Sequence, residues 1–297
     1  MYRTLASLLF LMLSLPVWAM PLVTPEWIDA HKKDPDLVLL DLQPQQNYIR
    51  FHIPGSINTD INQWRTEKQG QPKVLPPVKI LEQLIGNLGI GNDTHVVLIP
   101  LGASAGDLTQ AARLYWTFKV LGHDNVSILN GGLVSYAEAR RFPLEKGSNN
   151  PTPKAFKAHY RADYNPDTPA VRQAIESGAL AVDNRSRAEY LGIYGGGEGT
   201  RAGSLPDAVN LNYDWLTVNG GGKLQSEQNL KKIYGISEVP LEGEQIHYCH
   251  TGNRAALGWF VSHEILGNSQ ARLYDGSTEV WAADPSLPMQ KRVDLSH

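Results

Sequence analysis

Residues 246–256 read IHYCHTGNRAA and contain Cys249, the single cysteine of the chain. The segment opens with a short apolar run typical of a buried strand and ends with alanines that favour a helix. Between them lies a polar stretch in which Gly252 provides the backbone freedom for a tight turn. We predict a strand, a six-residue loop that begins at Cys249, and a helix. A loop of this kind can turn several backbone N–H groups inward and bind an anion.

The surroundings of Cys249 favour a reactive thiolate. The inward N–H groups, the positive end of the helix dipole and the guanidinium of Arg254 all stabilise an ionised sulfur over a thiol. A thiolate held in this way is a nucleophile. The alternative is an inert cysteine buried at a strand end, but the polar residues 250–254 favour the reactive form. With one cysteine in the chain, an intramolecular disulfide is impossible.

Short apolar runs and helical patterns alternate on both sides of this loop. The strands that we expect are 37–41, 95–99, 127–129, 179–183, 245–248 and 271–274, and the clearest helices are 108–121 and 255–266, which end at Gly122 and Gly267. Such alternation predicts a parallel sheet covered by helices on both faces. Ligands of such sheets bind beyond the carboxyl ends of the strands, which is where Cys249 lies.

The two halves of the chain repeat one pattern. The first-half residues Asn130, Tyr136 and Pro143 are matched, at one constant spacing, by Asp275, Trp281 and Pro288. This match indicates two tandem copies of one fold. Residues 147–153 read GSNNPTP, a composition typical of a linker. We therefore predict a first domain at 21–147, a linker at 148–168 and a second domain at 169–297.

Residues 1–19 are predicted to be a signal peptide. Arg3 precedes an apolar run at 5–15, Pro16 ends this run, and small residues at 17 and 19 suit a cleavage site. The run is shorter than the ~20 residues of a helix that spans a bilayer. We expect cleavage after Ala19 and a soluble, exported protein of the periplasm.

The composition is typical of a folded protein with a substantial core. The chain has 297 residues, of which 42% are hydrophobic, and this excludes disorder as a description of the whole. Its formal net charge is −3 and its basic residues are scattered. Binders of nucleic acid or of anionic membranes concentrate cations on one face. We therefore expect neither partner, and we expect a monomer.

These motifs together resemble the tandem-domain form of the rhodanese, or thiosulfate sulfurtransferase, family. The resemblance rests on CHTGNR at 249–254, VDNR at 182–185, GSLPDAVN at 203–210, YDGS at 274–277 and, in the first half, FHIPGSIN at 51–58. It covers nearly all of the mature chain. It implies an α/β fold of two tandem rhodanese-like domains, each a mainly parallel sheet with helices on both faces.

The resemblance also implies a sulfurtransferase that works through a persulfide on the catalytic residue, Cys249. The sulfur would come from thiosulfate or a related anionic donor and pass to cyanide or a thiol. The residues expected to bind the donor are His250, Thr251, Gly252, Asn253, Arg254 and Arg185. We expect no cofactor. We expect no metal either, because no carboxylate or second cysteine completes a ligand set with His247, Cys249 and His250. The first domain has Pro100 where the second has Cys249, so it is expected to be non-catalytic, and the resemblance implies that it is a structural or cleft-forming partner.

Three features depart from the family pattern or leave two interpretations open. Glu189 stands where the family often has a basic residue, and an acid there disfavours an anionic donor. Arg185 either forms a structural ion pair with Asp183, which we favour, or contacts substrate directly. The glycine-rich segment 192–203 is either a plain insertion or a flap over the cleft.

Two other functions compete with the sulfurtransferase. A sulfur-carrier or partner-binding module would use the same fold without turnover. A cysteine phosphatase or arsenate reductase has five residues between its cysteine and its arginine, whereas four separate Cys249 from Arg254. The shorter loop favours a sulfur-centred donor over a tetrahedral phosphate.

Overall fold

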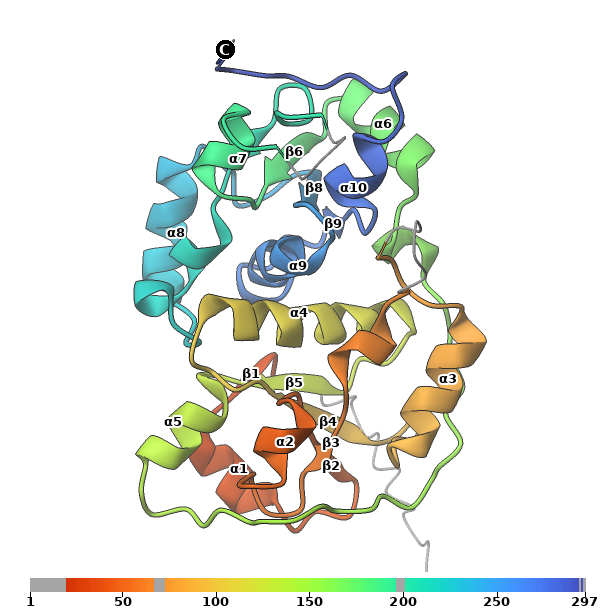
Figure 1. Cartoon of the computed structure of the whole chain (residues 1–297), viewed down its shortest axis with the longest axis vertical. Helices are drawn as coiled ribbons and strands as arrows, with labels where there is room; N and C mark the ends of the chain where they lie inside the picture. Colours follow the sequence, from red (N-terminus) through yellow and green to blue (C-terminus); the bar gives the residue numbers. More distant parts are fainter. Residues whose placement is uncertain (1–19, 67–72, 196–200, 294, 296–297) are drawn as a thin grey trace, which may run out of the picture.

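The computed structural model describes residues 20–66, 73–195, 201–293 and 295. The predicted signal peptide, 1–19, and part of the glycine-rich segment, 196–200, lie outside these residues. The described chain forms two domains at opposite ends of an elongated molecule, each built around its own sheet (Figure 1). Among the described helices, none is both long and apolar enough to cross a membrane.

The described part of the first domain contains a parallel sheet with the strand order β1-β5-β4-β2-β3. Its strands are β1 (Leu22–Val23), β2 (Leu37–Asp41), β3 (Ile57–Asn58), β4 (His95–Ile99) and β5 (Val126–Leu129). The helices are α1 (Pro25–His31), α2 (Gln45–Tyr48), α3 (Val78–Asn87), α4 (Ala105–Val120), α5 (Gly132–Glu138) and the 3₁₀ helix η1 (Ile61–Trp64). Residues 96–99 of β4 are fully buried because helices cover both faces of the sheet.

The described part of the second domain repeats this plan with the strand order β7-β6-β8-β9, again parallel. Its strands are β6 (Leu180–Asp183), β7 (Val209–Asn210), β8 (Gln245–Tyr248) and β9 (Ala271–Leu273). The helices are α6 (Thr168–Glu176), α7 (Arg187–Leu191), α8 (Glu227–Ile236), α9 (Asn253–Phe260) and α10 (Ser277–Trp281), with short 3₁₀ helices η3 (Tyr213–Leu216) and η4 (Val218–Gly220). The predicted α/β fold of two tandem domains is confirmed.

The predicted strands agree with the structure to the residue for β2, β4 and β8, and to within one residue for β5, β6 and β9. The two predicted helices both begin too late. Ser104 is the N-cap of α4 and forms a capping box with Asp107, so α4 begins at Ala105. Gly252 is the N-cap of α9, which begins at Asn253. The helix predicted to continue to 266 changes at Val261 into a π-helical turn, η5 (Val261–Ile265).

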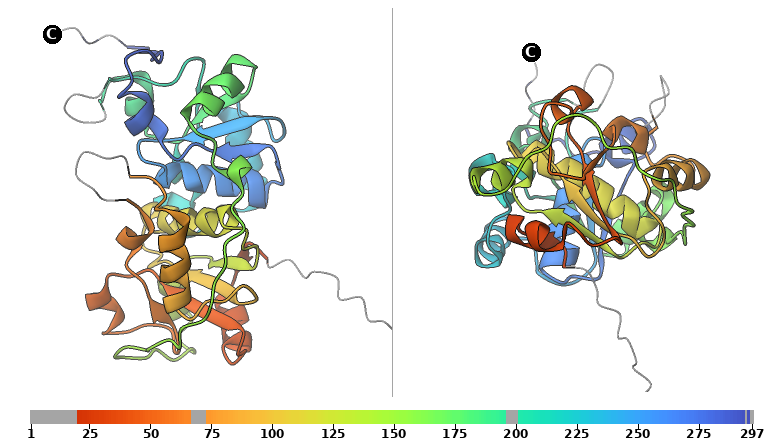
Figure 2. Two further views of the ribbon diagram at one scale, coloured as in Figure 1. Left: turned by 90° about the vertical axis from the view of Figure 1, so that its right-hand side faces the viewer. Right: turned by 90° about the horizontal axis from the view of Figure 1, so that it is seen from below.

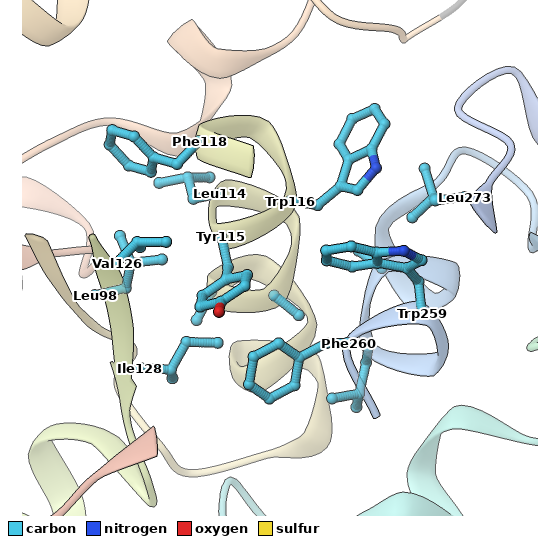
Figure 3. Close-up of a cluster of buried hydrophobic side chains, with 14 of the residues drawn as sticks. Leu98, Leu114, Tyr115, Trp116, Phe118, Val126, Ile128, Trp259, Phe260 and Leu273 are labelled. Carbon is cyan, nitrogen blue, oxygen red and sulfur yellow. The ribbon is translucent and has the colours of Figure 1, made fainter. Parts of the chain in front are cut away.

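The two domains share one hydrophobic core. Helix α4, yellow in Figure 1, lies against α9, and Figure 2 shows the same junction from the side. In Figure 3 the aromatic rings of Tyr115 and Trp116 lie close to those of Trp259 and Phe260. The Tyr115 and Phe260 rings meet edge to face with centroids 4.9 Å apart, a geometry worth about 0.5–1.5 kcal/mol beyond area burial. The position of α9, and of the loop before it, therefore depends on the first domain.

The segment predicted as a linker, 148–168, lies against the first domain. Phe156 is buried in the shared core, and the Lys154 N–H donates to the Gly86 carbonyl at 3.0 Å. The short 3₁₀ helix η2 (Ala162–Tyr164) then leads into α6. The segment is thus packed, while the domain boundaries at 147 and 169 stay predictions.

Candidate active site

The loop that carries Cys249 is shorter than predicted. Because β8 ends at Tyr248 and α9 begins at Asn253, the loop comprises residues 249–252. Asn253 and Arg254 belong to the first turn of α9, since Gly252 has a φ of +83° and makes the left-handed turn from which the helix starts. The loop lies beyond the carboxyl end of β8, the edge at which parallel sheets bind ligands.

The sulfur of Cys249 is buried and hydrogen-bonded at the same time. The Gly252 N–H donates to Sγ at 3.1 Å. The Cys249 N–H donates to Ser277 Oγ at 3.1 Å, and the Cys249 carbonyl accepts from the Thr278 N–H at 3.1 Å. Cys249 is 1% exposed, far less than its polar neighbours led us to expect. Cys249 thus belongs to the hydrophobic cluster that surrounds α9 while its sulfur accepts the Gly252 N–H.

Arg254 lies in the first turn of α9 but is paired with Glu189 of α7. The two N–H···O contacts measure 2.7 and 2.9 Å, the fork geometry typical of an arginine with a carboxylate. The capping box of α7 fixes Glu189 further, because Ser186 Oγ donates to it at 2.7 Å. Burial opposes ionisation, but the bonds from Arg254 outweigh it and lower the pKa of Glu189 to about 2. Glu189 was expected to disfavour the binding of an anionic donor. In the structure its carboxylate neutralises the charge of Arg254.

Arg185 forms the ion pair with Asp183 that the sequence analysis favoured. Its Nη2 lies 2.6 Å from Asp183 Oδ2 and also donates to the Gly203 carbonyl at 2.6 Å. Tyr248, the residue before the cysteine, donates its hydroxyl to the same carboxylate at 2.9 Å. Arg185 is 2% exposed. These contacts tie the end of β6 to the end of β8, while direct contact of Arg185 with substrate stays a prediction.

The first domain contributes two arginines that the sequence analysis missed. Arg113 of α4 reaches across to the second domain, where its Nη2 lies 2.6 Å from Asp275 Oδ1 and both side chains are buried. Arg65, just after η1, donates a hydrogen bond to the carbonyl of Thr251 within the loop. Arg113 interrupts an apolar helix and could have been noticed for that reason. Nothing in the sequence around Arg65 points to the loop.

Of the other predicted residues, His250 lies within the loop and Asn253 is the first residue of α9. His250 is half-buried, with Nδ1 3.3 Å from Thr278 Oγ1, and burial lowers its pKa, so the neutral imidazole is favoured at neutral pH. Asn253 lines a cavity of about 250 Å³ together with Arg65 and Arg113. Part of the predicted flap, 196–200, lies outside the described residues. Just after it, Arg201 donates to the carbonyls of residues 281, 282, 284 and 287.

Comparison with known proteins gives one consistent result. A family model described as "Rhodanese-like domain" matches residues 24–139 and again 167–284. A putative thiosulfate sulfurtransferase of Saccharopolyspora erythraea is 30% identical over 278 residues, which cover 91% of this chain and 95% of the relative. The thiosulfate sulfurtransferase of Mus musculus is 30% identical, covering 88% and 91%. The sulfur carrier protein TtuD of Thermus thermophilus is 30% identical, covering 91% and 96%.

A solved structure agrees with these relatives. SseA from Escherichia coli, described with the rhodanese fold and catalytic mechanism of 3-mercaptopyruvate sulfotransferases, superposes with a TM-score of 0.77. It is 25% identical, and the match covers 87% of this chain and 99% of SseA. The fold of nearly all of SseA is therefore shared with this chain.

Proposed function

The chain belongs to the rhodanese-like family and is a sulfurtransferase, and from this premise we propose that Cys249 carries the transferred sulfur. The observation that supports this assignment is the 3.1 Å hydrogen bond from the Gly252 N–H to Cys249 Sγ. Nucleophilic cysteines of enzymes commonly lie at the start of a helix with backbone N–H groups directed at the sulfur.

The proposed reaction has two steps. In the first, with thiosulfate as the anionic donor, the Cys249 thiolate attacks the outer sulfur of thiosulfate. A new S–S bond forms, the S–S bond of the donor breaks, and sulfite leaves with the electron pair. In the second, cyanide or a thiol attacks the outer sulfur of the Cys249 persulfide, and the Cys249 thiolate leaves. The protein's contribution is to hold negative charge at the loop throughout, so most of the catalysis is electrostatic.

A steady-state assay tests this function. With thiosulfate as donor and cyanide as acceptor, we expect the purified protein to form thiocyanate over many turnovers and Cys249→Ala to form none. Thermal unfolding of the variant would verify that it is folded. Turnover that persists in Cys249→Ala would contradict the assignment, because the variant contains no thiol.

A second function, a sulfur carrier without turnover, is favoured by one observation. Glu189 forms an ion pair with Arg254, so this arginine attracts a dianionic donor such as thiosulfate only weakly. A relative of similar identity is itself described as a sulfur carrier protein. Loading of Cys249 with sulfur in stoichiometric amount, followed by release to a protein thiol but not to cyanide, would support the carrier.

We further propose that residues 1–19 are removed and that the mature protein is a periplasmic monomer free of the membrane. The charged start, apolar run and small residues at 17 and 19 support export. Fractionation of cells that express the full chain should give a periplasmic protein that begins at Met20. A membrane-bound product that retains residues 1–19 would contradict this proposal.

A further inference from the structure

Most cations near the Cys249 loop are already neutralised. Of the four arginines near the loop among the described residues, three have a carboxylate partner. The pairs are Arg185 with Asp183 at 2.6 Å, Arg254 with Glu189 at 2.7 Å, and Arg113 with Asp275 at 2.6 Å. A paired guanidinium attracts an incoming anion weakly, because the carboxylate beside it cancels most of its field. These pairs leave open which group attracts an anionic donor.

Arg65 is the arginine near the loop that lacks such a partner within the described residues. Its Nη2 donates to two backbone carbonyls, those of Thr251 and of Lys73, the latter at 2.5 Å. Its Nε is buried without a hydrogen-bond partner in the same part of the chain. Burial and the nearby charge of Arg113 lower the pKa of Arg65 to about 10, so it remains a cation at neutral pH. Asp275 and Glu279 act on Arg65 through their charges, but within the described residues its bonded partners are neutral carbonyls, so its guanidinium can still bind an anionic ligand.

A cavity adjoins Arg65 at the junction of the domains. It has a volume of about 250 Å³, and its lining includes Arg65, Lys73, Arg113, Asn62 and the loop-side residue Asn253. No carboxylate belongs to its described lining. A small cavity with cations and amides, and without acids, suits a small anion that accepts hydrogen bonds.

We propose that this cavity binds the anionic end of the sulfur donor, a sulfonate or a carboxylate, and that Arg65 supplies the charge that recognises it. The inference rests on the proposed role of Cys249. Both domains then contribute to the donor-binding site. The second domain provides the sulfur nucleophile, and the first, which has no cysteine, provides the cation. Arg65 is then a donor-binding residue, and the pairing of Arg254 with Glu189 no longer counts against an anionic donor.

A pair of alkylating reagents tests this proposal without relying on turnover. Iodoacetate and iodoacetamide attack the same sulfur and are similar in size, but the first is an anion and the second is neutral. Both react with the thiolate, so a change in the ionised fraction of Cys249 cancels in the ratio of their rates. The ratio of the iodoacetate rate to the iodoacetamide rate therefore measures how strongly positive charge near Cys249 attracts the anionic reagent.

We expect Arg65→Met to lower this ratio by about tenfold, the loss expected for one charge-assisted contact. Arg65→Gln should lower it similarly while it can still donate an N–H to the Thr251 carbonyl, which separates charge from loop support. Arg65→Lys should keep most of the ratio. The matched control is Arg141→Met, since Arg141 is an exposed arginine of the same domain paired with Glu26. It should leave the ratio unchanged.

The same variants should affect the two half-reactions differently. The kcat/KM for thiosulfate should fall about tenfold in Arg65→Gln, mainly through KM. The preloaded persulfide should react at the wild-type rate with dithiothreitol, which has no sulfonate or carboxylate for Arg65 to bind. An unchanged alkylation ratio in folded Arg65→Gln would overturn the proposal, and so would an equal fall in Arg141→Met. Failure of the wild-type protein to take up sulfur would contradict the proposed function and not the anion site. The two failures can be distinguished because the alkylation ratio measures anion binding near Cys249 without any sulfur transfer.

Discussion

Single residues around the loop show what a sequence can and cannot reveal about a site. The position of Cys249 at a strand end, before a glycine and a helix, follows from local pattern, and the structure agrees with it. The partner of Arg254 could not be predicted in this way. Glu189 lies on another helix and meets Arg254 only when the sheet brings α7 beside α9. The sequence alone suggested that Glu189 repels the donor, whereas it binds the arginine.

The Glu189–Arg254 pair gives a prediction about pH at the same scale. The pKa of Glu189 falls from 4.5 to about 2 in the folded protein. A carboxyl whose folded pKa is depressed contributes stability above its unfolded value, and that contribution is lost as pH falls from about 4.5 toward 2. We expect Glu189→Gln to be less stable than wild type by about 1–3 kcal/mol at pH 7, with the difference shrinking below pH 4.5.

Urea unfolding at a series of pH values measures this difference. The control is Glu227→Gln, because Glu227 is exposed and paired with Lys231 on the same helix. That substitution should change stability by less than about 1 kcal/mol at every pH. A Glu189→Gln difference that stays constant from pH 7 to pH 3 would contradict the ion-pair account.

At the scale of elements, the strands were predictable and the helix starts were less so. The starts of β2, β4 and β8 were predictable because each strand follows a polar residue, at positions 36, 94 and 244. Helix starts depend on caps, and caps depend on one side chain or one backbone angle. Ser104 and Gly252 each moved a helix start by two or three residues, which shortened the Cys249 loop from six residues to four.

Gly252 is the residue on which the shape of the loop depends most. Its φ is +83°, and a Cβ built there would lie 2.4 Å from Arg113 Nη1. We expect Gly252→Ala to cost about 1–2 kcal/mol from the left-handed backbone and more from the clash. Because the Gly252 N–H bonds to Cys249 Sγ, sulfur uptake from thiosulfate should also slow at least tenfold.

The matched control for this substitution is Gly267→Ala. Gly267 has nearly the same φ, +82°, but a Cβ there would meet nothing within 4 Å. It should lose stability through backbone strain alone and take up sulfur at the wild-type rate. Thermal unfolding and single-turnover sulfur uptake measure both effects, and equal behaviour of the two alanine variants would contradict the role given to the loop.

At the scale of the whole molecule, the tandem repeat predicted two domains but not what they do for each other. The first domain, which has Pro100 in place of a cysteine, was expected to be a structural or cleft-forming partner. In the structure it also places Arg65 against the loop and Arg113 against Asp275. These contacts arise from the packing of α4 on α9, and no local pattern in the sequence encodes that orientation.

The buried pair between the domains gives a prediction at this scale. Arg113→Met leaves the Asp275 carboxylate buried without its cation, which should destabilise the protein by about 3–5 kcal/mol. Combining it with Asp275→Asn should recover much of that loss. A double-mutant cycle followed by urea unfolding measures the coupling. The exposed pair of Arg141 with Glu26 is the control and should couple by less than about 1 kcal/mol. Similar coupling in both pairs would contradict the buried interface.

The most direct test of sulfur transfer through Cys249 is the intact mass of the protein after incubation with thiosulfate. We expect the wild-type chain to gain the mass of one sulfur atom and to lose it again on addition of cyanide, while Cys249→Ala gains nothing. A wild-type protein whose mass does not change, or a gain of sulfur that persists in Cys249→Ala, would contradict the account.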